Sequence, residues 1–160
     1  MLTEFQRTRA WEGLLSAETR SLYFGDLASR YTRQKQWITG VSFFFSSGAA
    51  ATIIGRAPTW VPVVLALTVA AATAYSIAVN LDRRIATMAK LHSNWSKIAA
   101  EYSRLWNHTS DQDAEDQLDA IINSEREPSE LATTEAPNDQ ELLGQWQDRV
   151  FRMYHLEKPA

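Results

Sequence analysis

The chain has 160 residues, with 16 Lys and Arg against 19 Asp and Glu, a formal net charge of -3 and no cysteine. Disulfides, thiolate metal sites and a cysteine nucleophile are thereby excluded, and this length corresponds to about one domain. The charges are unevenly distributed, because two long uncharged runs lie between charged flanks.

Residues 1–35 are predicted to form an N-terminal helical segment. A stripe of apolar and aromatic side chains recurs there at helical spacing: Tyr23, Phe24, Leu27, Ala28 and Tyr31. Ser16 is a suitable N-cap, so we expect the helix to begin near it. The first twenty residues contain several charges and no apolar core of signal-peptide length, which argues against a cleaved signal.

The two uncharged runs, Gln36 to Gly55 and Ala57 to Leu81, are separated only by Arg56. At 1.5 Å per residue, about 20 helical residues cover the ~30 Å hydrocarbon core of a bilayer. The sequence therefore predicts an all-α membrane protein with a two-helix transmembrane hairpin at residues 36–81, spans at about 37–55 and 60–81, and long helices that extend into a cytoplasmic helical bundle. The alternative is a pair of buried helices in a soluble bundle, but such helices normally keep a polar face.

The flanking charges predict the orientation of this hairpin, because Lys and Arg near a span tend to stay in the cytoplasm. The basic residues that flank the two runs are Arg30, Arg33, Lys35, Arg83, Arg84 and Lys90. The short connection between the runs carries only Arg56. We therefore expect a multi-pass membrane protein in contact with the lipid bilayer, with both termini in the cytoplasm.

Small residues recur at four-residue spacing along both runs and define a predicted packing face. Its members are Ser42, Ser46, Ala50, Ala66, Ala70, Ala74 and Ala78. Small side chains on one helix face let two backbones approach closely, either within the hairpin or between copies in a homo-oligomer. Neither run contains Asp, Glu, Lys, Arg or His, which argues against a proton relay or a coupled transporter.

Residues 82–108 are predicted to form a cytoplasmic helical stalk. Large side chains follow one another there in steps of four and three, which is typical of a helix-pairing heptad. The members of this predicted coupling seam are Ile85, Met88, His92, Trp95, Tyr102 and Trp106. No Gly or Pro interrupts the chain between Leu81 and Trp106. We therefore expect one helix to run from Trp60 to about Trp106.

Residues 109–160 are predicted to contain an acidic linker and a C-terminal amphipathic helix. Asp111 to Ser124 reads as a short polar helix and the following acidic stretch as a flexible linker. Asn138, with Glu141 three residues later, is the expected cap of the last helix. That helix could dock on the stalk or lie on a bilayer, and we favour docking because acidic residues dilute its positive charge.

No catalytic, metal or cofactor site is predicted. The three histidines are scattered, and His92 reads as a packed, hydrogen-bonded residue more readily than as a metal ligand or proton switch. No phosphate-binding loop or nucleophile motif occurs, and a sustained basic surface for nucleic acid is missing. We expect a protein that is not an enzyme and that does not bind nucleic acid.

The segments RYTRQKQWITG (Arg30 to Gly40) and NLDRRIATMAKLHSNWSKIAAEYSRLW (Asn80 to Trp106) give the chain a layout that resembles the SLATT family of bacterial two-transmembrane proteins. The resemblance covers about Leu15 to Trp106. It implies a membrane effector of an anti-phage defence system in the bacterial inner membrane, which oligomerises through its spans and permeabilises or depolarises that membrane. The trigger would come from a cytoplasmic partner that makes or senses a nucleotide signal.

Two hypotheses for the function follow. The first is this defence effector. The second is a non-enzymatic membrane scaffold that anchors a cytoplasmic partner. Growth arrest on induced expression would separate an effector from a scaffold.

Overall fold

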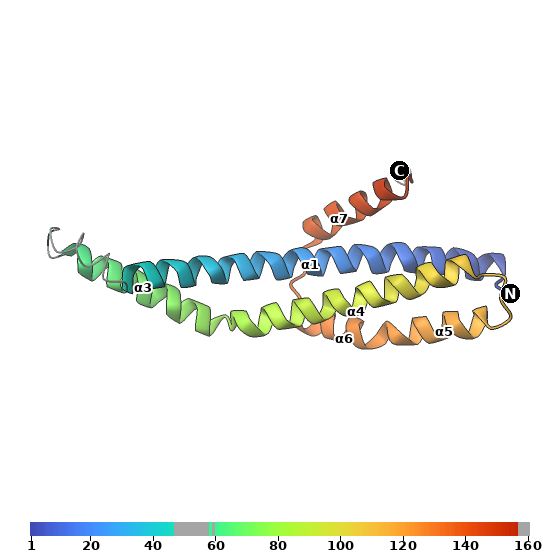
Figure 1. Ribbon diagram of the computed structural model, residues 1–160, viewed down its shortest axis with the longest axis horizontal. Helices are drawn as coiled ribbons and strands as arrows, with labels where there is room; N and C mark the ends of the chain where they lie inside the picture. The colour runs from blue at the N-terminus through green and yellow to red at the C-terminus, as the bar shows by residue number, and fades with distance from the viewer. Residues whose placement is uncertain (47–57, 59, 157–160) are drawn as a thin grey trace. The chain divides into compact units, whose positions relative to one another are not determined.

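The computed structural model describes residues 1–46, 58 and 60–156, and all regular structure within these ranges is helical (Figure 1). The helices are α1 (Glu4–Ser46), α3 (Trp60–Ala78), α4 (Leu81–Asn107), α5 (Ala114–Ser124), α6 (Arg126–Glu135) and α7 (Gln140–Met153). The chain divides into two compact units. Unit 1 comprises Met1–Leu27 and Ala86–Ala160, and unit 2 comprises Ala28–Ile85.

Helix α1 begins at Glu4, well before the expected start at Ser16. Thr3 and Gln6 cap it reciprocally: the Gln6 N–H donates to the Thr3 hydroxyl oxygen over 3.3 Å, and the Thr3 N–H donates to Gln6 Oε1 over 2.8 Å. This is the hydrogen-bonding arrangement of a capping box. This capping pair is visible in the sequence, but the aromatic stripe that begins at Tyr23 led to the prediction of a later helix start.

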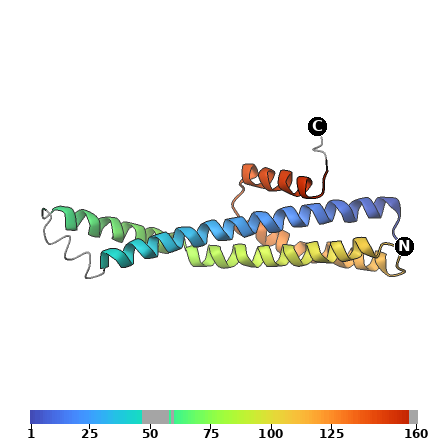
Figure 2. The same ribbon diagram turned by 45° about the horizontal axis from the view of Figure 1, so that its top comes forward.

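In unit 1, α1 and α4 lie side by side in both views, and α5 and α6 follow α4 (Figures 1 and 2). Each of the two long helices buries a strip of apolar side chains. The buried members of these strips include Leu14, Ala17, Phe24, Leu27, Met88, Leu91, Trp95, Ile98, Tyr102 and Leu105. Burial of such side chains from water is the main stabilising contribution to a helical bundle of this kind.

Two shorter helices follow α4, and the second of them replaces the predicted flexible linker. Helix α5 (Ala114–Ser124) corresponds to the expected polar helix and buries Leu118 and Ile121. Helix α6 (Arg126–Glu135) occupies most of the stretch expected to be flexible, and its Pro128 is buried in the first turn. Proline is compatible with that turn, because the backbone N–H that it lacks would have no intrahelical partner there.

Helix α7 begins one residue later than the sequence suggests. Asp139, rather than Asn138, is the N-cap, and its carboxylate accepts the Leu142 N–H over 3.0 Å. The carboxylate also carries a negative charge at the positive end of the helix dipole, which favours Asp over Asn at this position.

Unit 2 consists of the last turns of α1, helix α3 and the first turn of α4. The expected unbroken helix from Trp60 to Trp106 is interrupted, because α3 ends at Ala78 and α4 begins at Leu81. Asn80 between them has a φ of 50°, a left-handed conformation that Asn tolerates better than most residues. Lys35 of α1 pairs with Asp82 of α4, but both side chains are too exposed for this ion pair to contribute much.

The predicted transmembrane hairpin is corrected by the structure. Within the described residues, no helix combines the length and the apolar character that a membrane crossing requires. Helix α3 has 19 residues, or ~28 Å at 1.5 Å per residue, and stops before the predicted end at Leu81. In α1 the uncharged part that is described is limited to residues 36–46. For the same reason, the predictions of an inner-membrane localisation, of its topology and of a membrane pore are wrong. Residues 47–55 of the first predicted span lie outside the described residues.

Candidate functional site

The predicted coupling seam divides between the interior and the surface of α4. Met88, Trp95 and Tyr102 are buried, with exposed fractions of 0%, 1% and 2%. Ile85 is half-buried, whereas His92 and Trp106 are exposed. Three of the six members of the seam therefore lie in the core, and two, His92 and Trp106, lie at the surface.

The buried residues that the seam missed are Leu91, Ile98 and Leu105, of which Leu91 and Leu105 each lie one residue before a seam member. Together with Met88, Trp95 and Tyr102 they form alternating steps of three and four, the spacing of a helix-pairing face. Trp106 still has a partner, since its ring centre lies 5.0 Å from that of Trp11 in α1. The sequence contained the correct spacing, but the seam took His92 and Trp106 in place of the buried Leu91 and Leu105.

His92 links α4 to α1 through Ser21. Its Nδ1 lies 2.8 Å from the Ser21 carbonyl oxygen and 3.2 Å from the Ser21 hydroxyl, which itself lies 2.6 Å from the hydroxyl of Ser96. A carbonyl oxygen can only accept, so His92 Nδ1 carries the proton and donates. Across the described residues no group of His, Asp and Glu side chains could hold a metal ion.

Two tyrosines in unit 1 have perturbed acidity. Burial, reinforced by the neighbouring Glu125 carboxylate, raises the pKa of Tyr102 far above its usual value. Burial, together with a hydrogen bond to Glu18, raises the pKa of Tyr154 to about 12. Both phenols therefore remain protonated donors at neutral pH, which suits structural hydrogen bonding rather than acid–base chemistry.

Helix α7 packs on α1 in unit 1 through aromatic side chains. The Tyr154 hydroxyl donates to Glu18 Oε1 over 2.8 Å, and its ring meets that of Trp11 edge-on at 5.2 Å. Near the other end, Trp146 Nε1 donates to Asp26 Oδ2 over 3.3 Å. Val150 is fully buried between these contacts. Helix α7 is therefore docked on α1, whereas the sequence favoured docking on the stalk.

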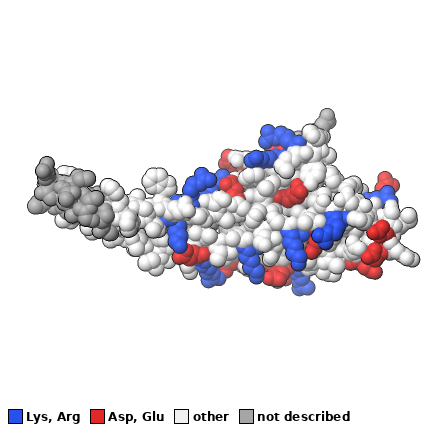
Figure 3. All heavy atoms as spheres, in the orientation of Figure 1, with Lys and Arg blue, Asp and Glu red and all other residues white. Residues whose placement is uncertain are grey.

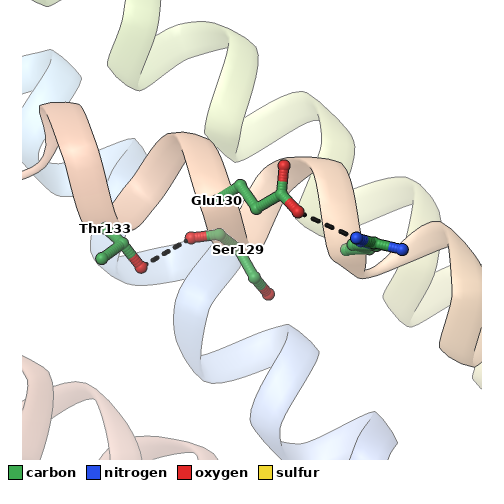
Figure 4. A network of polar contacts seen from close by, with 4 residues as sticks. Ser129, Glu130 and Thr133 are labelled. Atoms are coloured by element: carbon green, nitrogen blue, oxygen red, sulfur yellow. Dashed lines mark hydrogen bonds and ion pairs between the residues drawn. The ribbon is translucent and has the colours of Figure 1, made fainter.

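A groove of about 460 Å³ lies in unit 1 where α1, α4 and α6 meet the connection to α7. Its walls are formed by Arg20, Tyr23, Phe24, Trp95, Ser129, Ala132, Thr133, Ala136, Pro137, Asn138, Asp139 and Leu143. The Tyr23 hydroxyl fixes the connection by donating to the Pro137 carbonyl over 2.6 Å. On α6, the Thr133 hydroxyl is turned back to the Ser129 carbonyl, 2.9 Å away (Figure 4). Apart from Trp95, the sequence offered no signal for this groove, because its residues come from four separate segments.

The predicted packing face is exposed where the structure describes it. All four alanines, Ala66, Ala70, Ala74 and Ala78, lie at the surface of α3, and Ser42 is half-buried in α1. Ala50 lies outside the described residues, as does the side chain of Ser46. The structure therefore leaves the alanine side of this face open to a partner.

Around this face, large apolar side chains of unit 2 are also exposed, and together they form what we call the unit 2 apolar surface. It comprises Trp37, Phe43, Phe44, Trp60, Val63, Val64, Leu67, Tyr75 and Ile77, with exposed fractions from 49% to 77%. In the view of Figure 3, charged side chains cover the helices of unit 1, and none lies over the described part of α3. Several large exposed apolar side chains on one short, uncharged helix favour an interaction site there.

Comparisons with family models, with curated proteins and with solved structures return no match for this chain.

Proposed function

We propose that this chain is a non-enzymatic effector of a bacterial anti-phage system, and that it acts by associating with further copies of itself through the unit 2 apolar surface. The setting is supported by the resemblance of Leu15 to Trp106 to the SLATT family. The mode of action is supported by one observation: the largest apolar side chains of α3 face outward. A permeabilised membrane is not part of this proposal, because no described helix could span one.

A second copy is the partner that fits this surface best. Helix α3 carries no charged residue, so two copies can meet there without like-charge repulsion or buried unpaired charge. Every fourth residue along one face of α3 is an alanine: Ala66, Ala70, Ala74 and Ala78. A helix face of small side chains allows close approach of an identical helix. Symmetric contacts between equal patches are the commonest form of self-association.

The first experiment measures the size of the full-length chain by analytical ultracentrifugation, with Leu67→Glu as the test variant. Leu67 is 65% exposed, so a carboxylate there leaves the fold intact and places a charge in the proposed interface. The matched control is Phe5→Glu, which makes the same change at a 76% exposed apolar residue of unit 1. We expect oligomers for the parent and the control, and monomers for Leu67→Glu.

A monomeric parent at tens of micromolar would contradict the proposal. So would a parent that binds phosphatidylcholine vesicles through this surface without forming oligomers, because the surface would then belong to lipid.

The second experiment tests the effector role by induced expression in bacteria at matched protein levels. We expect the parent and Phe5→Glu to arrest growth when a partner gene supplies the trigger, and Leu67→Glu to leave growth unaffected. Arrest by a variant that no longer associates would overturn the proposed mechanism. Association without any arrest would identify the chain as a scaffold instead.

A further inference from the structure

The groove of unit 1 has the character of a small-molecule site, and the proposed function makes no use of it. Its volume of about 460 Å³ falls within the range of ligand pockets. Buried aromatic rings, Tyr23, Phe24 and Trp95, form part of its wall, with exposed fractions of 5%, 4% and 1%. Such pockets hold the apolar part of a ligand and select it through a few polar groups.

Trp95, which lines the groove, has an unused donor. Its Nε1–H is buried, and no acceptor pairs with it among the described residues. An indole N–H can only donate, and a buried donor without a partner is destabilising, so native structures nearly always satisfy it. An acceptor supplied by a bound molecule would remove that cost.

Arg20 contributes a cation directly above the same ring. Its guanidinium carbon lies 4.5 Å from the centre of the Trp95 ring, a cation–π arrangement. In the described part of the chain Arg20 forms no ion pair with a carboxylate. Asp139, the acidic member of the wall, already accepts the Leu142 N–H as the cap of α7. The positive charge of Arg20 is thus available to an anion in the groove.

We propose that this groove binds a small carboxylic acid with an aromatic or branched apolar group. The carboxylate accepts hydrogen bonds from the Arg20 guanidinium, whose carbon lies 4.5 Å from the Trp95 ring centre, and from Trp95 Nε1. The apolar group lies against Phe24, Ala132 and Leu143. Paired donors from a guanidinium and a neighbouring N–H suit the planar, two-oxygen geometry of a carboxylate.

Titration calorimetry on the full-length chain tests the charge requirement with two probes of equal shape, 3-phenylpropionate and 3-phenylpropanamide. Because a charge-assisted hydrogen bond is about twice as strong as a neutral one, we expect the acid to bind at least about tenfold more tightly than the amide. Arg20→Gln should abolish that preference. The control Arg126→Gln removes an exposed arginine of α6 that pairs with Glu130 and does not line the groove, and it should leave both affinities unchanged.

The second variant, Trp95→Phe, tests the indole donor while it keeps an aromatic ring in the core. We expect it to weaken binding of the acid about fivefold, with a thermal transition recorded on the same sample to show that the chain is folded. Leu67→Glu, the variant that breaks self-association, should bind the acid like the parent, which separates this proposal from the preceding one. Absence of acid binding at millimolar concentration, equal affinity for acid and amide, or unchanged affinity in Arg20→Gln would each overturn the assignment.

Discussion

Gly13 of α1 lies directly against the ring of Tyr102 in α4. A β-carbon on Gly13 would be 2.5 Å from Tyr102 Cζ and 2.8 Å from the phenolic oxygen. Tyr102 is 2% exposed and hydrogen-bonds to Glu125, so its ring has no free space into which to move. Glycine in a helix interior costs ~0.5 to 1 kcal/mol relative to alanine, and this contact explains why it is present here.

Gly13→Ala should therefore destabilise the protein although alanine is the better helix former. We expect a loss of about 1 to 3 kcal/mol, measured by urea unfolding, because extra volume in a packed core displaces its neighbours. Gly144→Ala in α7 is the matched control, since no atom lies within 4 Å of the added carbon. That change should stabilise by about 0.4 to 1 kcal/mol. Two stabilising substitutions would contradict the close approach of α1 and α4.

Leu105 and Trp106 test which residues of α4 face the core. Leu105 is 1% exposed and Trp106 40% exposed, so truncating the smaller residue should do more damage. We expect Leu105→Ala to cost about 2 to 5 kcal/mol by leaving a cavity. Trp106→Ala should cost about 1 kcal/mol, mainly through its lost ring contact with Trp11. Chemical denaturation of both variants decides the order, and the reverse order would restore the seam expected from sequence.

The raised pKa values of Tyr102 and Tyr154 predict instability in alkali. A folded pKa of about 12 for Tyr154, against 10.0 in the unfolded chain, means that the folded state holds a proton that the unfolded state loses in this window. Its contribution is complete below pH 10 and disappears as the pH rises toward 12, because stability falls with pH wherever the folded state binds more protons. Urea midpoints should fall less steeply over this range in Tyr154→Phe than in the parent. Parallel slopes in the two proteins would refute the coupling.

Asp139 and Asn138 distinguish the observed cap of α7 from the expected one. Asp139→Ala removes the acceptor of the Leu142 N–H and should destabilise α7 by about 1 kcal/mol. Hydrogen exchange would detect this as faster exchange in α7. Asn138→Ala, at an exposed neighbouring position, should leave the exchange of α7 unchanged. Equal effects of the two substitutions would remove Asp139 from its capping role.

The sequence predicts helix content more readily than helix limits in this chain. The apolar spacing around Trp95 and Tyr102 predicts α4. The apolar residues Leu118 and Ile121 within an acidic stretch predict α5. The break at Asn80 could not be read from spacing, because the side-chain pattern continues through it while the backbone does not. The absence of charge in residues 57–81 likewise does not indicate where α3 ends. The predicted span therefore ran past the end of that helix.

The candidate sites differ in how visible they are in the sequence. The alanines of α3 were identifiable from their four-residue spacing alone. The groove was not, because Arg20 and Trp95 are separated in sequence, and the missing acceptor of Trp95 Nε1 is a property of packing. His92 was recognised as a hydrogen-bonded residue, but its partner Ser21 has no sequence signal.

The contacts between α1 and α4 also restrict how the two helices can align during folding. Trp11, Gly13 and Ser21 meet Trp106, Tyr102 and Ser96 in turn, so each step forward along α1 is matched by a step back along α4. Sliding one helix by a heptad, about 10 Å, would keep apolar faces together but place Tyr102 opposite Gln6 or Arg20. Neither residue leaves the space that Gly13 provides. The glycine therefore discriminates against misaligned pairings that hydrophobic burial alone would tolerate.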